Sequence, residues 1–292
     1  MMRPSSMKIV RIVAELREWS RDLRGAAPRN TAGPIALVPT MGALHAGHAS
    51  LIRAAASAAP GRVAVSIFVN PTQFGPHEDF ARYPRSFEAD CALAESAGAS
   101  LVFAPSIEEL YPTGASTFVE VDGLSSRLDG HSRPGHFRGV ATVVAKLLIA
   151  AEPDLAFFGQ KDAAQVAVLR RMVCDLRLAT RLVACPIVRE PDGLALSSRN
   201  VYLSAAERAQ ALTLSRALRR IESLVASGQR SASVLIEEAR KVFAAEPAVR
   251  IDYIDLVDWS TLLPVDTATP GTLFAVAASV GSTRLIDNTI LR

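Results

Sequence analysis

Short apolar segments alternate with longer segments of helical period between Ile35 and Val188, and this alternation restricts the fold more than any other feature. Runs of Val, Ile, Leu and Phe bounded by turn residues are typical of strands buried on both faces of a parallel sheet. The predicted strands cover residues 35–39, 63–69, 101–104, 154–158 and 182–188, and the predicted helices cover residues 48–59, 86–97, 139–151 and 162–176. The pattern predicts an α/β fold with a Rossmann-like, doubly wound parallel sheet.

The pattern changes after residues 191–193, which read Pro-Asp-Gly. Two amphipathic helices are predicted over residues 204–226 and 232–245, and three β-rich segments follow, beginning at Ile251, Thr272 and Thr283. Helices followed by strands, rather than alternating with them, are typical of an α+β unit. We therefore predict a larger Rossmann-like domain over residues 1–188 and a smaller C-terminal α+β domain over residues 189–292.

Charge and cysteine content argue against several classes of protein. Lys and Arg number 32 against 29 Asp and Glu, and the signs are interspersed, so we expect no nucleic-acid partner. The cysteines at 91, 174 and 185 are far apart and lack metal-ligand spacing, so we expect buried free thiols. Because no run of about 18 apolar residues occurs and the N-terminus lacks the hydrophobic stretch of a signal peptide, we expect a cytoplasmic protein without membrane contact.

The segment PTMGALHAGH, residues 39–48, leaves the first predicted strand and enters the first predicted helix. Ligands of a doubly wound sheet bind at the carboxyl ends of its strands, and a helix start presents unpaired N–H groups to an anion. Gly42 and Gly47 permit close backbone approach, and His45 and His48 can donate hydrogen bonds to phosphoryl oxygens. Histidines at this spacing also occur on helix surfaces and in metal sites, but no third ligand lies nearby. The combination favours a nucleotide site.

Two further segments place polar groups beside predicted strands or helices. Asn70 and Gln73, in SIFVNPTQFG, offer amides that suit a substrate with hydroxyls and a carboxylate, although a solvated Asn-Pro turn fits equally well. SRPGHFRGV, residues 132–140, places two arginines and a histidine before an apolar helix. These side chains either attract anions or form a solvated loop.

The last two segments add cations and hydroxyls. Lys161, in FFGQKDAAQ, follows a strand end and can neutralise α-phosphate charge, while Asp162 can cap the next helix or contact a water bound to Mg²⁺. A surface lysine beside an ordinary helix cap is the alternative. In REPDGLALSSRN, residues 189–200, two hydroxyls and a guanidinium can hold phosphates as pyrophosphate leaves, or the segment is a serine-rich hinge.

Taken in order, the five segments resemble the pantothenate synthetases of the HxGH nucleotidyltransferase superfamily. PTMGALHxGH is the long form of the superfamily's first signature, and GLALSSRN resembles the second, the counterpart of KMSKS. The resemblance implies a ligase that uses ATP to convert (R)-pantoate into pantoyl adenylate and then joins it to β-alanine, releasing pyrophosphate and AMP. It also implies Mg²⁺ with ATP, a homodimer, and a small domain that closes over an ATP- and pantoate-binding larger domain. After residue 204 only length and layout agree.

The resemblance also implies roles for individual residues. Catalytic roles fall on His45, His48, Lys161 and Arg199. ATP contacts fall on Pro39, Thr40, Met41, Gly42, His45, Gly47, His48, Gly159, Lys161, Asp162, Val188, Leu196, Ser197, Ser198 and Arg199. Contacts to pantoate or β-alanine fall on Asn70, Gln73, Val143, Val144 and Gln165, with the valines facing the geminal methyl groups of pantoate. Many family members carry Glu at Gln160 and an aromatic residue with Gln at Ala163-Ala164, so the fine shape of the pocket is not carried over.

Two other functions fit part of the pattern. Another HxGH nucleotidyltransferase would transfer AMP to a phosphorylated vitamin precursor and form no amide, and a non-catalytic nucleotide-binding module would bind ATP without releasing pyrophosphate. An aminoacyl-tRNA synthetase is disfavoured because no anticodon-binding domain or basic stripe is recognisable. The metal ligands are not assigned by the sequence, and Asp90 and Asp162 are the candidates.

Overall fold

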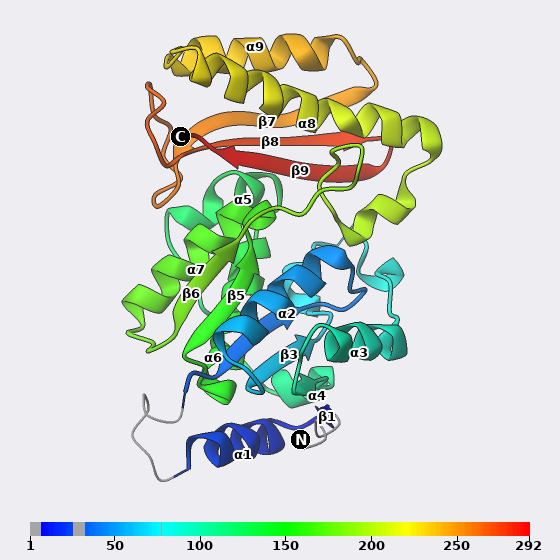
Figure 1. The fold of residues 1–292 in the computed structure, drawn as a ribbon, viewed down its shortest axis with the longest axis vertical. Coiled ribbons are helices and arrows are strands. Elements are labelled where there is room, and N and C mark those ends of the chain that lie inside the picture. Colours follow the sequence, from blue (N-terminus) through cyan, green and yellow to red (C-terminus); the bar gives the residue numbers. More distant parts are fainter. Residues whose placement is uncertain (1–6, 26–32, 77) are drawn as a thin grey trace.

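A computed structural model describes residues 7–25, 33–76 and 78–292. Within these residues the strands form a six-stranded parallel sheet and a three-stranded antiparallel sheet. The larger sheet has the order β1-β4-β3-β2-β5-β6 and consists of β1 (Lys8–Val10), β2 (Ala36–Thr40), β3 (Val63–Ile67), β4 (Leu101–Phe103), β5 (Leu155–Gly159) and β6 (Arg181–Cys185). The predicted doubly wound α/β sheet with a smaller C-terminal α+β unit is confirmed (Figure 1).

Helices cover both faces of the larger sheet. One face packs against α2 (Ala46–Ala58) and α3 (Phe87–Ser96), around Ile52 and Val102. The other packs against α1 (Val13–Arg24), α6 (His136–Ala151) and α7 (Ala163–Asp175). Short helical turns complete the domain: η1 (Pro71–Gln73), η2 (Phe80–Arg82), α4 (Ile107–Leu110), η3 (Leu124–Ser126), α5 (Asp129–Ser132) and η4 (Gln160–Asp162). The strand order reverses between β2 and β5, which places the ends of these two strands at the usual position of a ligand site.

The C-terminal part consists of η5 (Ser198–Tyr202), α8 (Ala205–Ala226), α9 (Ala232–Ala244), β7 (Val249–Asp258), β8 (Thr272–Val280) and β9 (Thr283–Ile290). Because side chains alternate along a strand, β8 has two apolar faces. Phe274 and Val276 belong to the core under α8 and α9, whereas Leu273 and Ala275 belong to the core of the larger domain. The three strands therefore lie between the two helices and the larger domain, as Figure 1 shows.

Several predicted details need correction. Helix α2 begins at Ala46 rather than His48, because the His45 side chain caps it. Strand β6 ends at Cys185, before a proline that cannot donate to the ladder. Strand β1 and helix α1 were not predicted. The expectation of three buried thiols is wrong, since Cys185 is buried but Cys91 is half-buried and Cys174 is exposed on the solvent face of α7.

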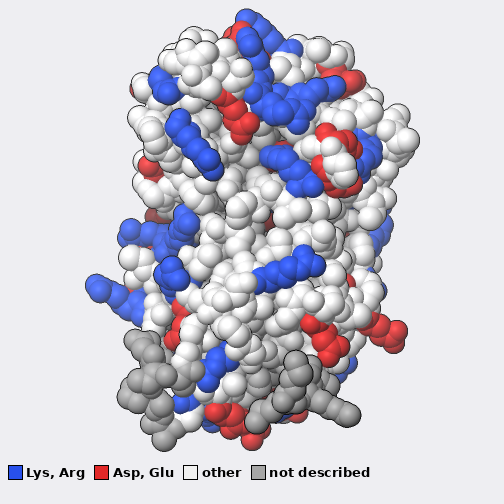
Figure 2. All heavy atoms as spheres, viewed as in Figure 1, with Lys and Arg blue, Asp and Glu red and all other residues white. Residues whose placement is uncertain are grey.

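The surface carries charges of both signs. In the view of Figure 2, Lys and Arg side chains form separate clusters with Asp and Glu between them, rather than one continuous stripe. Among the helices that the structure describes, none has both the length and the apolar character needed to cross a bilayer.

Candidate active site

Two adjoining cavities of about 170 Å³ each lie at the carboxyl ends of β2 and β5. Thirteen of the fifteen predicted ATP positions line the first cavity: Pro39, Met41, His45, Gly47, His48, Gly159, Lys161, Asp162, Val188, Leu196, Ser197, Ser198 and Arg199. The second cavity is lined by all five predicted substrate positions, Asn70, Gln73, Val143, Val144 and Gln165, and by Thr40. Gly42 lines neither. Segments distant in sequence thus meet at one place, and His48 and Gln165 border both cavities.

The two histidines of the first segment lie side by side at the start of α2, with ring centroids 4.2 Å apart. The Nδ1 of His45 accepts from the Gly47 amide at 3.1 Å, and the Nδ1 of His48 accepts from the His45 amide at 3.3 Å. Each neutral ring therefore carries its proton on Nε2. Burial lowers the pKa of both, with Lys161 adding to the effect on His45 and His45 to that on His48, whose pKa falls to about 3. Near neutral pH both are uncharged hydrogen-bond donors.

Asp90 holds the loop that precedes these histidines. Gly42 has a φ of +86° and Ala43 a φ of +49°, a left-handed turn that Gly adopts without strain. The Asp90 side chain, 2% exposed, accepts from the backbone amides of Ala43 at 2.9 Å and Leu44 at 2.8 Å. Since both carboxylate oxygens face the loop and Asp90 lines neither cavity, the structure does not favour it as a Mg²⁺ ligand.

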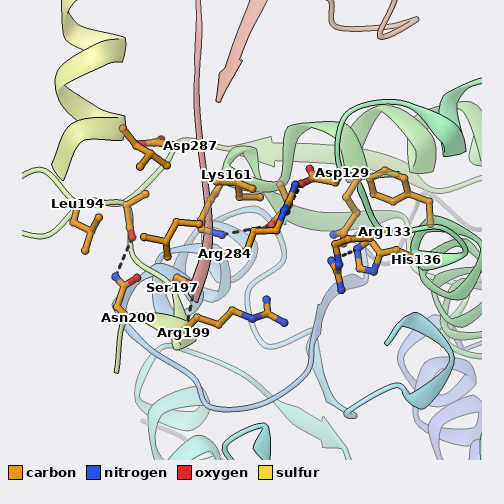
Figure 3. Close-up of a pocket in the computed structure, with 17 residues that line it drawn as sticks. Asp129, Arg133, His136, Lys161, Leu194, Ser197, Arg199, Asn200, Arg284 and Asp287 are labelled. Atoms are coloured by element: carbon orange, nitrogen blue, oxygen red, sulfur yellow. Dashed lines mark hydrogen bonds and ion pairs between the residues drawn. The ribbon is translucent and has the colours of Figure 1, made fainter. Parts of the chain in front are cut away.

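Lys161 lies in the turn η4, where β5 ends and α7 begins. Its Nζ is 3.6 Å from the Asp162 carboxylate and faces the first cavity. Figure 3 shows the adjoining space between the domains, where Lys161 and Arg199 lie near Arg284 and Asp287 of β9. The lysine thus enters the site at the junction of the two domains.

Two consecutive carboxylates after β3 bind the arginines predicted from the sequence. Asp79 accepts from Arg199 Nε at 3.1 Å and Nη2 at 2.9 Å, and Glu78 accepts from Arg133 Nε at 2.7 Å and Nη2 at 2.6 Å. Burial opposes ionisation, but the arginine hydrogen bonds outweigh it and lower the pKa of both acids. These acids are functional candidates that sequence reasoning missed, since neither belongs to a recognised motif.

The amides of the second segment form a connected set. Asn70, 1% exposed, donates to Gln73 Oε1 at 3.0 Å and to the Gly139 carbonyl at 3.1 Å. Its Oδ1 accepts from Thr72 Oγ1 at 2.9 Å and from Tyr111 OH at 3.0 Å. Protein partners therefore occupy the whole Asn70 amide. The Gln73 Nε2 has two N–H groups, and its contact to the Met41 sulfur uses one of them, which leaves the other for a ligand.

Helix α6 supplies the apolar wall of the second cavity. Val140, Val143, Val144 and Leu147 line it, at the spacing of one helix face. The helix approaches closely because residue 139 is glycine: a Cβ there would lie 2.3 Å from the Thr72 carbonyl oxygen. Polar side chains that include Gln73, Gln165 and Arg199 also line the cavity, so it suits a small molecule with a branched apolar end and a polar end.

The family follows from comparison with known proteins. A family profile described as pantoate-beta-alanine ligase matches residues 8–290. The pantothenate synthetase of Acidobacterium capsulatum is 57% identical over 291 residues, which cover 98% of this chain and 97% of that protein. The chain belongs to the pantoate–β-alanine ligase family. The recognition made from the five segments is confirmed.

Solved pantoate–β-alanine ligase structures share the fold. The pantothenate synthetase of Thermus thermophilus superposes with a TM-score of 0.90 at 45% identity and covers 97% of this chain and 99% of its own. The pantoate–β-alanine ligase of Francisella tularensis, complexed with "Beta-gamma ATP and Beta-alanine", superposes with a TM-score of 0.78 at 32% identity and 97% coverage of both chains. Among the residues of the present chain that the structure describes, no group of three or more His, Cys, Asp or Glu is placed to hold a metal ion.

Proposed function

We propose that the chain condenses (R)-pantoate with β-alanine to pantothenate, using ATP and passing through pantoyl adenylate. The observation that carries the proposal is the junction of two unlike cavities. One has neutral imidazole N–H groups and a lysine at helix starts, which suits a triphosphate. The other combines an apolar helix face with the amides of Gln73 and Gln165, which suits the geminal methyls and polar groups of pantoate. The cavities share His48 and Gln165, so a carboxylate in one lies next to a phosphate in the other.

The first step requires little beyond positioning and charge stabilisation. A carboxylate oxygen of pantoate attacks the α-phosphorus, and the P–O bond to pyrophosphate breaks. His45 and His48 donate from Nε2 to phosphoryl oxygens without carrying charge, while Lys161 supplies the positive charge that the developing anion needs. Ser197, Ser198 and Arg199 bind the departing pyrophosphate. Each such donor contributes on the order of 3 kcal/mol to lowering the barrier.

In the second step the β-alanine amine attacks the acyl carbon and loses a proton to solvent, the acyl C–O bond breaks, and AMP leaves with the former carboxylate oxygen as the amide forms. Gln73 and Gln165 orient the pantoyl group, and Val143 and Val144 contact its methyl groups. For Asn70 we propose an indirect role, because its amide is fully used in holding Gln73.

Mg²⁺ with ATP is part of the proposal. Mg²⁺ is typically bound through one or two carboxylates, phosphate oxygens and water. Asp162 offers a partly exposed carboxylate beside Lys161, which fits such a site, and the ion would offset phosphate charge there. A cytoplasmic homodimer, implied by the resemblance, is also proposed, and light scattering of the purified protein tests the dimer.

The deciding experiment omits one component at a time from ATP, Mg²⁺, pantoate and β-alanine while pyrophosphate, AMP and pantothenate are measured. We expect pyrophosphate to require pantoate, and AMP release to require β-alanine as well. AMP transfer independent of β-alanine would indicate a different nucleotidyltransferase, and ATP binding without pyrophosphate would indicate a non-catalytic module. His48→Ala should abolish adenylate formation in a folded protein, and near-normal turnover of that variant would contradict the role of His48.

A further inference from the structure

We propose that Asn288, on β9 of the C-terminal domain, is a positioning residue for Lys161, and that Gln160 is its matched partner. The inference deepens the proposed function and rests on it, since Lys161 acts there on the phosphates. It assigns the smaller domain a part in building the catalytic centre rather than only in covering it.

The Asn288 amide is directed entirely at the turn that carries Lys161. Its Nδ2 donates to the carbonyl oxygens of Gln160 at 3.0 Å and Lys161 at 2.9 Å. Its Oδ1 accepts from Gln160 Nε2 at 3.2 Å. Asn288 is 4% exposed, so water cannot readily reach its amide, and losing these partners would leave buried polar groups without hydrogen bonds. The Nδ2 group thus binds two backbone carbonyls of η4, and the amide oxygen binds the Gln160 side chain of the same turn.

Neighbouring contacts make this attachment rigid. Trp259, which follows β7, donates from Nε1 to the carbonyl of Ala163 at 3.0 Å, so a second side chain from the C-terminal domain holds the first residue of α7, directly after this turn. On β9 itself, the Asp287 carboxylate accepts from the backbone N–H of Asn288 at 2.8 Å and from Arg189 Nη1 at 2.6 Å and Nη2 at 2.9 Å. The strand that presents Asn288 is therefore anchored to the segment between the domains.

The Lys161 side chain starts from this turn, so a shift of the turn's backbone also shifts the starting point from which the ammonium reaches the cavity. A displacement of about 1 Å at a reacting centre can reduce the rate on the order of 100-fold. The pairing also accounts for an amide rather than a carboxylate at Gln160, whose Nε2 donates to Asn288 Oδ1. A carboxylate at position 160 would face the Asn288 oxygen, and two acceptors would then repel each other. Rotating the Asn288 amide by half a turn would not help, because its oxygen would then face the two backbone carbonyls.

The test compares Asn288→Leu with Thr289→Ala in the full-length protein. Thr289 is the next residue of β9, and its hydroxyl binds Glu222 on the exposed side, so this control also loses a hydrogen bond without touching η4. The measurements are single-turnover pyrophosphate release with ATP and pantoate, the KM of each substrate, and thermal unfolding. We expect Asn288→Leu to slow pyrophosphate release about 10- to 100-fold with little change in the pantoate KM, and Thr289→Ala to behave as the wild type.

A double mutant separates positioning from general disruption. In a Lys161→Ala background, Asn288→Leu should slow the reaction by less than about threefold, since the group it positions is gone. An equal loss in both backgrounds, or an Asn288→Leu rate within about twofold of the wild type, would overturn the inference. If Asn288→Leu does not fold, Asn288→Asp replaces it with the same expectations, because a carboxylate of the same shape directs an acceptor oxygen at the carbonyls of Gln160 and Lys161.

The proposed function and this inference fail in different ways. A wild-type protein that releases no pyrophosphate with ATP and pantoate would refute the proposed function. Calorimetric titration with ATP would then still test the positioning. We expect Asn288→Leu to weaken ATP binding and Thr289→Ala to leave it unchanged, and equal affinities in all three proteins would refute the role of Asn288.

Discussion

Acid should destabilise the fold through two half-buried histidines, His48 and His136. Burial, reinforced by Arg133, lowers the pKa of His136 to about 4, and burial, reinforced by His45, lowers that of His48 to about 3. Both titrate near 6.5 when unfolded, so below that pH the unfolded chain binds more protons than the folded one. The two histidines therefore contribute fully to the free energy of unfolding above pH 6.5, and this contribution decreases as the pH falls. Between pH 7 and pH 5 the free energy of unfolding should drop by about 2 kcal/mol for each histidine.

The substitution His136→Asn isolates one of them. His136 Nδ1 is 2.8 Å from the Gln73 carbonyl oxygen and Nε2 is 2.9 Å from Arg133 Nη1, so the neutral ring donates from Nδ1 and accepts at Nε2. Asn can keep the donor to Gln73 but does not titrate. In urea unfolding at pH 7 and pH 5, the wild type should lose about 2 kcal/mol more than the variant. Parallel losses in the two proteins would refute the reasoning.

Three further predictions concern the site. Lys161→Ala should slow pyrophosphate release on the order of 100- to 1000-fold without lowering the melting temperature, as stopped-flow and thermal unfolding measurements can show. Val144→Ala should raise the pantoate KM about 5- to 30-fold, corresponding to a loss of about 1–2 kcal/mol of apolar contact, while the ATP KM in steady-state assays stays unchanged. Asp90→Asn should cost about 1–3 kcal/mol in urea unfolding and raise the ATP KM, because one backbone N–H of the Gly42–Leu44 turn loses its acceptor.

The sequence was sufficient for the larger domain because its signals are local. Strands such as Leu101–Phe103 are continuous apolar runs, and segments of helical period separate them. Functional segments follow strand ends, so the topology of a parallel sheet brings them together without knowledge of side-chain contacts. The edge strand β1 was missed because it has three residues, and two of them are exposed.

The residues that organise the site were harder to predict because their signals are not local. Asp79 and Glu78 are ordinary acidic residues until folding places Arg199 and Arg133 opposite them. Asn70 was expected to contact substrate, but its four polar partners within the protein leave its amide no free capacity. Asp90 looked like a metal ligand by residue type, whereas its carboxylate holds a left-handed turn.

The C-terminal domain shows why its role cannot be read from its own sequence. Residues of β8 alternate between two cores, and β9 directs Asp287 at Arg189 and Asn288 at the Lys161 turn. A domain attached in this way cannot move far from the larger domain without breaking the hydrogen bonds of Asn288 to the turn and of Trp259 to the start of α7. Closure of residues 189–292 over the site stays a prediction. These contacts mean that any such motion would also displace the lysine on which adenylate formation depends.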